Sequence, residues 1–461
     1  MERSALTADN TVFVILSFEG PDRYSLAGGL GTRITYLSQA LAAMGFPTHL
    51  FFVGDPKGKG EESVDSSPLT LHRWSQWISE YYPSGVYQGE NDKVNDFNDS
   101  IPPFVVDRII EPAVSAEKLV VVLSEEWHTA EALCRVSEQL RARGMRGSVV
   151  TFWNANNTYG FDRIDWPRLA ENTAITTVSR YMKHIMRGMG INPLVIPNGI
   201  PEILLPEVDH RISGKLRERM GSEVLLAKVA RYDKTKGWDE AIEATARFNR
   251  EGTKTVLLAR GGIEPYGEEV LYNARQLGLK VKDLTSGTED MRGYLEAVDN
   301  QDGAEVLNIR FQCPPELLRI LYHASDAVLA NSSHEPFGLV GLEAMAAGGI
   351  AFTGGTGEDY AVHMRNAIVL ETSDPREIES YLTYLDGHGD KKEDIRKSAR
   401  HTARAFTWEE IIKNLIERTE SQALMQGALR RSVRNPVSEP PMEGLPQTVL
   451  MDQAMSPATA G

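Results

Sequence analysis

The sequence predicts an α/β protein built on two mainly parallel sheets, because short apolar segments alternate with amphipathic segments of helical periodicity. Residues 11–17 form a continuous apolar run, which is typical of a strand buried on both faces. Ile34, Leu37 and Leu41 then share one face of a helix, and residues 48–53 return as a strand. Such a strand–helix–strand unit opens a doubly wound domain.

A second set of strands and helices starts after residue 200, so we place a domain boundary there. The strands of the first domain, 1–200, are expected at 11–17, 48–53, 119–123, 147–152, 174–179 and 194–200. Those of the second domain, 201–400, are expected at 224–230, 255–259, 306–310, 326–330, 350–353 and 367–370. Residues 56–100 and 280–304 are polar and are predicted to be irregular loops and a surface excursion. The proline-rich segment 425–461 is predicted to be a disordered tail.

The composition is that of an ordinary globular protein, with 41% hydrophobic and 25% charged residues. A net charge of −15 argues against nucleic-acid binding, which requires a basic face. Cys134 and Cys313 lie far apart in the sequence, so a disulfide framework is not expected and a reducing cytoplasm fits better. No secretory signal and no apolar run long enough to span a bilayer is apparent. We therefore expect a cytoplasmic protein without a transmembrane segment.

Glu335 and Glu343 lie eight positions apart in residues 331–349, where a short Gly-containing loop precedes a helix. The first backbone N–H groups of a helix have no internal partner, and with the helix dipole they form an anion site suited to a diphosphate. A carboxylate beside a phosphate must face uncharged groups, such as the hydroxyls of a sugar or a ribose. The segment therefore predicts a nucleotide-sugar site, with Phe337, Gly338 and Leu339 as donor-binding residues at the start of the helix.

The same residues resemble the Glu-x7-Glu signature of retaining glycosyltransferases of the GT-B fold, family 4 in particular, to which glycogen and starch synthases are related. The resemblance spans residues 11 to about 424 and implies two Rossmann-like domains that face a central cleft. It implies that Glu335 contacts the transferred sugar and that Glu343 holds the ribose hydroxyls. It also implies that helices over 401–424 cross back to the first domain.

Two loops are predicted to contact the donor diphosphate. Arg231 and Lys236 lie five positions apart after a strand and match an Arg and a Lys of the family. Fixed cations there would stabilise a departing diphosphate. Gly28 and Gly29 lie between a strand and a helix and resemble the GT-B loop that lies against the donor. Glycogen and starch synthases have a lysine where this chain has Leu26, which counts against a bacterial-type glycogen synthase.

Two strand ends complete the predicted site. His128 resembles the histidine of the Asp-Trp-His-Thr run of glycogen synthases, which lies beside the reacting sugar, although Glu126 replaces the aspartate. Thr353, Gly354 and Gly355 resemble the family's Gly-Gly loop near the donor phosphates and sugar. Each motif alone is also consistent with a solvated turn or an ordinary core residue. Their occurrence together, in the order of the family, favours the site.

The resemblance implies a retaining hexosyltransferase that uses a nucleoside-diphosphate sugar (a UDP-, ADP- or GDP-hexose, with glucose the first choice) and a carbohydrate or small-molecule acceptor. Glu335, Arg231, Lys236 and His128 are the expected catalytic residues. No metal-ligand spacing is apparent, so no metal or other cofactor is expected. The alternatives are α-glucan elongation of the glycogen or starch synthase type, a nucleotide-sugar epimerase of the GT-B type, and a non-catalytic sugar-binding protein.

Overall fold

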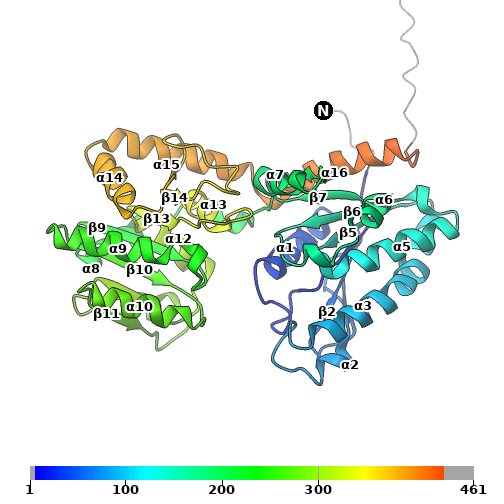
Figure 1. Ribbon diagram of the computed structural model, residues 1–461, viewed down its shortest axis with the longest axis horizontal. Helices are drawn as coiled ribbons and strands as arrows, with labels where there is room; N and C mark the ends of the chain where they lie inside the picture. The colour runs from blue at the N-terminus through cyan, green and yellow to red at the C-terminus, as the bar shows by residue number, and fades with distance from the viewer. Residues whose placement is uncertain (1–5, 300, 430–461) are drawn as a thin grey trace, which may run out of the picture.

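The computed structural model describes residues 6–299 and 301–429 and shows two lobes, each built on its own sheet (Figure 1). The first sheet has the strand order β3-β4-β2-β1-β5-β6-β7-β8, and all its pairs are parallel except β3 with β4. Its strands are β1 (Thr11–Leu16), β2 (Thr48–Val53), β3 (Glu61–Ser63), β4 (Leu69–Trp74), β5 (Leu119–Glu125), β6 (Val149–Ala155), β7 (Ala174–Thr177) and β8 (Leu194–Val195). The prediction of a mainly parallel sheet is confirmed.

Every residue of β1, β5 and β6 is buried, as the apolar sequences of these strands predict. Helices cover the sheet, and Ile34, Leu37 and Leu41 of the first helix lie in its core. This helix ends just before Gly45, whose φ of +91° is the left-handed conformation in which glycine is favoured. The helices of this lobe are α1 (Gly29–Ala43), α2 (Gln76–Ser79), α3 (Glu90–Val105), α4 (Glu111–Ser115), α5 (Ala130–Ala142), α6 (Trp166–Asn172) and α7 (Arg180–Gly188).

The second sheet is parallel throughout and has the strand order β11-β12-β10-β9-β13-β14-β15. Its strands are β9 (Val224–Val229), β10 (Thr255–Arg260), β11 (Val281–Leu284), β12 (Val306–Ile309), β13 (Ala327–Ala330), β14 (Ala351–Thr353) and β15 (Ile368–Val369). Its helices are α8 (His210–Met220), α9 (Trp238–Arg250), α10 (Tyr266–Gln276), α11 (Met291–Asp299), α12 (Pro315–Ala324), α13 (Leu339–Ala346), α14 (Pro375–Asp386) and α15 (Gly389–Arg404).

The last described helix, α16 (Trp408–Met425), lies over the first lobe, although it follows the helices of the second lobe in sequence (Figure 1). Its Ile412 and Leu415 belong to the core that contains α1. The chain returns through a short parallel pairing in which Ile200 N–H donates to Phe406 O at 2.8 Å and Trp408 N–H donates to Ile200 O at 3.2 Å. The two passages between the lobes therefore lie side by side.

Two segments differ from the sequence-based expectation. Residues 56–100 are not irregular, since they contain β3, β4, α2 and the first part of α3. Residues 280–304 contain β11, at an edge of the second sheet, and α11. The polar composition of these segments did not indicate strands or helices, because edge strands and exposed helices bury only one face. Most of the predicted tail, 430–461, lies outside the described residues.

Each sheet has a point at which the strand order reverses direction, between β1 and β5 in the first lobe and between β9 and β13 in the second. Loops at the carboxyl ends of the strands on either side of such a point diverge and leave a crevice, where α/β proteins bind ligands. In this chain the loops after all four of these strands line one cavity.

Candidate functional site: a cleft between the two lobes

The cleft between the lobes has a volume of about 1230 Å³ and takes residues from both sheets. Gly28, Gly29 and His128 line it from the first lobe, and Arg231 and Lys236 line it from the second. Glu335, Phe337, Gly338 and Leu339 also line it from the second lobe. These sequence-predicted residues, which span more than 300 positions of the chain, are therefore brought to one cavity.

The basic loop after β9 is attached to the loop after β13. Gly237 has a φ of +66°, and a Cβ atom there would lie 2.3 Å from the carbonyl oxygen of Asn331. Ser333 N–H donates to Thr235 O at 2.8 Å. Glycine at 237 thus permits a close approach that no other residue would allow, and this approach brings Lys236 to Glu335.

Lys236 and Glu335 form an ion pair, with Nζ and Oε2 2.6 Å apart. The two side chains are only 17% and 24% exposed, so the pair is partly shielded from solvent. Arg231 is exposed, and its guanidinium makes no hydrogen bond or ion pair with another described residue. Of the two predicted cations, Arg231 is therefore available to a ligand, whereas Lys236 is paired with a carboxylate.

Lys228, which the sequence analysis did not single out, is a third basic side chain at this wall. It lies on β9, is 1% exposed and lines the cleft. Its Nζ donates to Leu329 O at 3.1 Å and to Asn331 Oδ1 at 2.5 Å. Burial lowers the pKa of this amine to about 7. The signal in the sequence was a lysine inside an otherwise apolar strand.

The start of α13 faces the cleft. Its N-cap, Gly338, has a φ of +76°, and no side chain caps the helix. Phe337 is 2% exposed and packs near Tyr360 and Phe406, with ring centroids 5.8 Å and 6.2 Å away. The rigid packing of Phe337 holds the helix start in place, and the uncapped N–H groups of α13 are available to an anion.

The loop after β14 supports the Glu335 loop from behind and does not line the cleft. Thr353 and Gly354 are buried, and Gly355 is exposed. A Cβ atom on Gly354 would lie 2.1 Å from the carbonyl oxygen of Ser332, so this glycine allows two backbones to pack together. Gly357 N–H donates to Glu335 O at 2.8 Å. The predicted donor contacts of residues 353–355 are therefore not evident in this cavity.

Glu358 is a further buried acid that the sequence analysis missed. It is 5% exposed and lies beneath Gly338, where a Cβ would meet its Cγ at 2.7 Å. It accepts a hydrogen bond from Thr356 N–H at 3.1 Å. Burial raises its pKa to about 8. We infer that it fixes the loop that carries Glu335.

Glu343 lies on α13 and is not among the residues that line the cleft. It is half-buried, and Tyr322 O–H points to its Oε2 at 3.4 Å. Burial raises the pKa of Glu343 to about 7. Burial raises the pKa of Tyr36 on α1, and the carboxyl group of Glu343 adds to this effect. The structure separates the two glutamates, with Glu335 in the cavity and Glu343 behind the helix start.

The start of α1 lines the cleft, but three N–H groups around it already bind a carboxylate of the protein. Glu19, which follows β1, is 4% exposed, and its Oε2 accepts hydrogen bonds from the N–H groups of Ala27, Gly28 and Gly31 at 3.2, 2.9 and 3.0 Å. Tyr87 O–H donates to its other oxygen at 2.5 Å. An internal carboxylate thus satisfies donors that were predicted to contact the donor phosphates. Leu26, in the place of the lysine, is 48% exposed.

His128 is held rigidly at the cleft. It is 3% exposed and stacks against Phe18 and Trp127, with ring centroids 4.3 Å and 4.0 Å away. Its Nε2 lies 2.9 Å from Glu90 Oε1, and its buried Nδ1 has no hydrogen-bond partner among the described residues. Burial lowers the pKa of His128, against the opposite effect of Glu90. We therefore assign the neutral imidazole, with Nε2–H donating to Glu90.

Glu126 is buried at the first lobe's wall in a left-handed conformation, with a φ of +65°. Its Oε1 accepts hydrogen bonds from Asn156 N–H at 2.8 Å and from Asn157 Nδ2 at 3.2 Å. Burial raises its pKa to about 8, so the acid form predominates at neutral pH. Glu126 itself lines the cleft and holds the two asparagines beside it.

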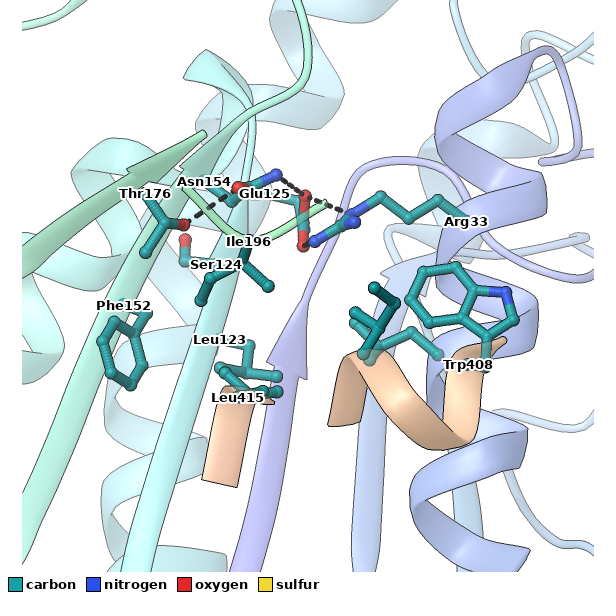
Figure 2. A pocket seen from close by; sticks show the side chains of 12 residues that line it. Arg33, Leu123, Ser124, Glu125, Phe152, Asn154, Thr176, Ile196, Trp408 and Leu415 are labelled. Carbon is teal, nitrogen blue, oxygen red and sulfur yellow. Dashed lines mark hydrogen bonds and ion pairs between the residues drawn. The ribbon is translucent and has the colours of Figure 1, made fainter. Parts of the chain in front are cut away.

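Beneath the wall, Glu125 is bound by Arg33, as Figure 2 shows. Arg33 Nε lies 3.2 Å from both carboxylate oxygens, and Asn154 Nδ2 donates to Glu125 Oε2 at 2.9 Å. Trp408 of α16 lies beside Arg33, and both line a cavity of about 20 Å³, the size of about one water molecule. Arg33 is 6% exposed, and its charge is paired with Glu125 inside the first lobe.

Two hydrogen bonds join the lobes beside the cleft. Tyr181 of α7 and His334 share one, with Oη and Nδ1 2.7 Å apart. Arg180 N–H donates to Asp359 Oδ2 at 2.7 Å. His334 is adjacent to Glu335, so these contacts set the position of the second wall relative to the first.

Two further properties concern the described part of the chain. No group of three or more His, Cys, Asp or Glu side chains within it is arranged to hold a metal ion. None of its helices has the length and apolar character that crossing a membrane requires.

Residues 211–402 match the family model for glycosyl transferases group 1. The chain is 27% identical over 238 residues to mannosylfructose-phosphate synthase from Agrobacterium fabrum, an alignment that covers 50% of this chain and 48% of that protein. It is 24% identical over 322 residues to D-inositol 3-phosphate glycosyltransferase from Geodermatophilus obscurus, covering 68% and 65% of the two chains. The chain thus spans about half to two thirds of the length of these relatives.

Two solved structures have the same fold. Sucrose-phosphate synthase from Thermosynechococcus elongatus superposes with a TM-score of 0.65 at 17% identity, over 90% of this chain and 100% of that one. The catalytic domain of starch synthase IV from Arabidopsis thaliana, bound to ADP and acarbose, superposes with a TM-score of 0.61 at 15% identity, over 90% and 99%. The prediction of two Rossmann-like domains of the GT-B class is confirmed. The family match and the relatives support a glycosyltransferase enzyme.

Proposed function

We propose that this protein is a retaining glycosyltransferase of family 4 that transfers a hexose from a nucleoside-diphosphate sugar to an acceptor hydroxyl. The observation that carries the proposal is one wall of the cleft, where Arg231, Lys236 and the uncapped start of α13 converge. A diphosphate has the charge and the acceptor oxygens that this arrangement would bind. Glucose is the first sugar to test.

In the proposed reaction the bond between the sugar C1 and the diphosphate oxygen breaks, and C1 bonds to the acceptor oxygen on the same face. The departing diphosphate gains charge, so Arg231 and Lys236 stabilise the transition state more than the ground state. The acceptor proton passes to the leaving phosphate oxygen. No metal ion is included in the proposal, because the two side chains supply the positive charge.

The remaining residues would position the sugar and the nucleotide. Glu335 would accept hydrogen bonds from sugar hydroxyls, and its ion pair with Lys236 would bring sugar and diphosphate into register. His128, neutral and stacked between two rings, would contact the sugar near its reacting face. Glu343 would hold the ribose once the lobes close on the donor.

A thermal-shift panel of UDP-, ADP- and GDP-hexoses tests the donor, because a ligand that binds only the folded protein raises the melting temperature. The best donor is then incubated with neutral sugars and polyols, and nucleotide release and the anomeric configuration of the product are measured. Release that depends on an acceptor, with retention, supports the proposal. Isomerised donor without an acceptor would indicate an epimerase, and donor binding without any release would indicate a binding protein.

A further inference from the structure

The two walls of the cleft differ in where their basic side chains lie. In the lining that the structure describes, Lys228, Arg231 and Lys236 all belong to the second lobe, together with the carboxylates of Asp233 and Glu335. The first lobe contributes the carboxyl groups of Glu19, Glu90 and Glu126, and no lysine or arginine. A ligand that crosses the cleft therefore meets basic side chains at one end only, and carboxyl and amide groups at the other.

A buried carboxylate already lies at the helix start of the first lobe, where a phosphate could otherwise bind. Glu19 Oε2 takes three backbone N–H groups around the start of α1, at 2.9 to 3.2 Å. A phosphate brought to this place would have to displace a buried carboxylate and would lie beside it. Like charges at such a distance in a partly desolvated site repel strongly.

The nearby cations of the first lobe are engaged elsewhere. Arg33 is bound to Glu125 and Asn198 beneath the wall. The buried amine of Lys93 donates to Tyr24 Oη and to the carbonyl oxygens of Gly85 and Val86. Arg163 lies over the ring of Trp127, 4.4 Å from its centroid, and does not line the cleft. Arg33 and Lys93 are therefore committed to partners inside the lobe, and Arg163 lies outside the lining, close enough to act on the charge of Glu90.

What the first lobe does offer suits hydroxyl groups. Asn156 and Asn157 line the cleft with amide groups, and Tyr87 and Tyr159 line it with phenol rings. Glu90 accepts a hydrogen bond from His128, and its side chain is 19% exposed at the cavity. Amides and carboxyls exchange hydrogen bonds with sugar hydroxyls without requiring a charge on the ligand.

We propose that the acceptor of this enzyme is an uncharged polyhydroxyl compound and that sugar phosphates are excluded by the first lobe's wall. The inference rests on the proposed function, because it assigns the second wall to the donor diphosphate. The similar proteins whose names contain a phosphorylated compound would differ from this chain in that respect. Specificity of this kind arises from a repulsive element as well as from attractive contacts.

The test compares matched acceptors that differ only in a phosphate: glucose with glucose 6-phosphate, fructose with fructose 6-phosphate, and inositol with inositol 3-phosphate. With the donor found in the panel, we compare the acceptor pairs of which at least one member is a substrate. In such a pair we expect kcat/KM to be at least about tenfold higher for the unphosphorylated compound. In parallel, with saturating nucleoside diphosphate, the phosphorylated member should raise the melting temperature no more than its partner does. A preference for the phosphorylated member in either assay would overturn the inference.

A charge added to the wall sharpens the test. Thr158 lines the cleft and is half-buried, so Thr158→Lys places a cation on the first lobe's wall. Asp162→Asn makes the same change of charge at an exposed position outside the lining. We expect T158K to reduce the ratio of kcat/KM between the unphosphorylated and the phosphorylated acceptor. D162N should leave this ratio unchanged. An unchanged ratio in T158K would contradict the role of wall charge.

The two proposals fail differently. If the inference is wrong and the function is right, donor binding and acceptor-dependent release persist, with phosphorylated acceptors preferred. If the function is wrong, nucleotide sugars neither raise the melting temperature nor release nucleotide. The donor panel, which contains no acceptor, therefore separates the two.

Discussion

The two walls of the cleft are built from the same kind of element, a loop at the end of a parallel strand, yet they treat charge in opposite ways. On the first lobe the carboxylate of Glu19 is saturated by backbone N–H groups, and that of Glu125 by Arg33 and asparagines. On the second lobe the guanidinium of Arg231 makes no hydrogen bond or ion pair with another described residue, and α13 starts without a cap. These two carboxylates of the first lobe have their partners within the protein, whereas the second wall leaves positive charge and N–H donors for a ligand.

The largest expected effect is on the second wall. Replacing both Arg231 and Lys236 by alanine removes the cations that would stabilise the departing diphosphate. We expect kcat to fall by about 10²–10³-fold or more, the loss seen when one preorganised stabilising group is removed. The control is Lys234→Ala, which removes a cation from the same loop at an exposed position outside the lining. An equal loss of kcat in K234A and in the double variant would show that the effect does not depend on the two cations that line the cleft.

A smaller effect is expected from the first wall, and on stability more than on chemistry. Glu19→Gln removes the charge that three N–H groups and Tyr87 O–H share. Loss of charged, buried hydrogen bonds should lower the free energy of unfolding by about 1–3 kcal/mol, measured by urea unfolding. The exposed Glu80 provides a matched Glu→Gln control, expected to change it by less than about 0.5 kcal/mol. A neutral result for E19Q would mean that the wall is not internally saturated.

These regions also show what the sequence reveals. The strands were predictable because a buried parallel strand is apolar along its whole length, as in β1 and β5. The Arg231, Lys236 and Glu335 motifs were identified through their resemblance to family motifs in the same order, because the spacing of each one alone also fits a solvated turn. The role of Glu19 was not predictable, because its contacts with the N–H groups of residues 27, 28 and 31 depend on how the loop folds back. Lys228 and Glu358 were missed because burial, rather than spacing, makes them unusual.

The smallest expected effect concerns pH. The pKa of Glu126 is raised by burial to about 8, so the folded protein holds this proton above the pH at which the unfolded chain releases it. The contribution of Glu126 to stability is therefore present below about pH 4.5 and is lost as the pH rises toward 8. Glu126→Gln should remove this dependence.

The pH experiment compares the wild type with E126Q by urea unfolding between pH 6.5 and 8. The unfolding free energy of the wild type should fall relative to the variant as the pH rises. His128 does not obscure the comparison, because its lowered pKa affects stability only below its ordinary value of 6.5. Parallel profiles for the two proteins would show that Glu126 is ionised in the folded state.

The account depends most on the statement that the second wall binds a diphosphate. Isothermal titration of UDP and uridine, ADP and adenosine, and GDP and guanosine, into the wild type and into R231A/K236A, measures this directly. For the base that the protein accepts, we predict that the diphosphate binds at least about tenfold more tightly than the nucleoside, and that the double variant loses this advantage. Equal affinities of nucleoside and diphosphate for the wild type, or an advantage that survives in the double variant, would contradict it.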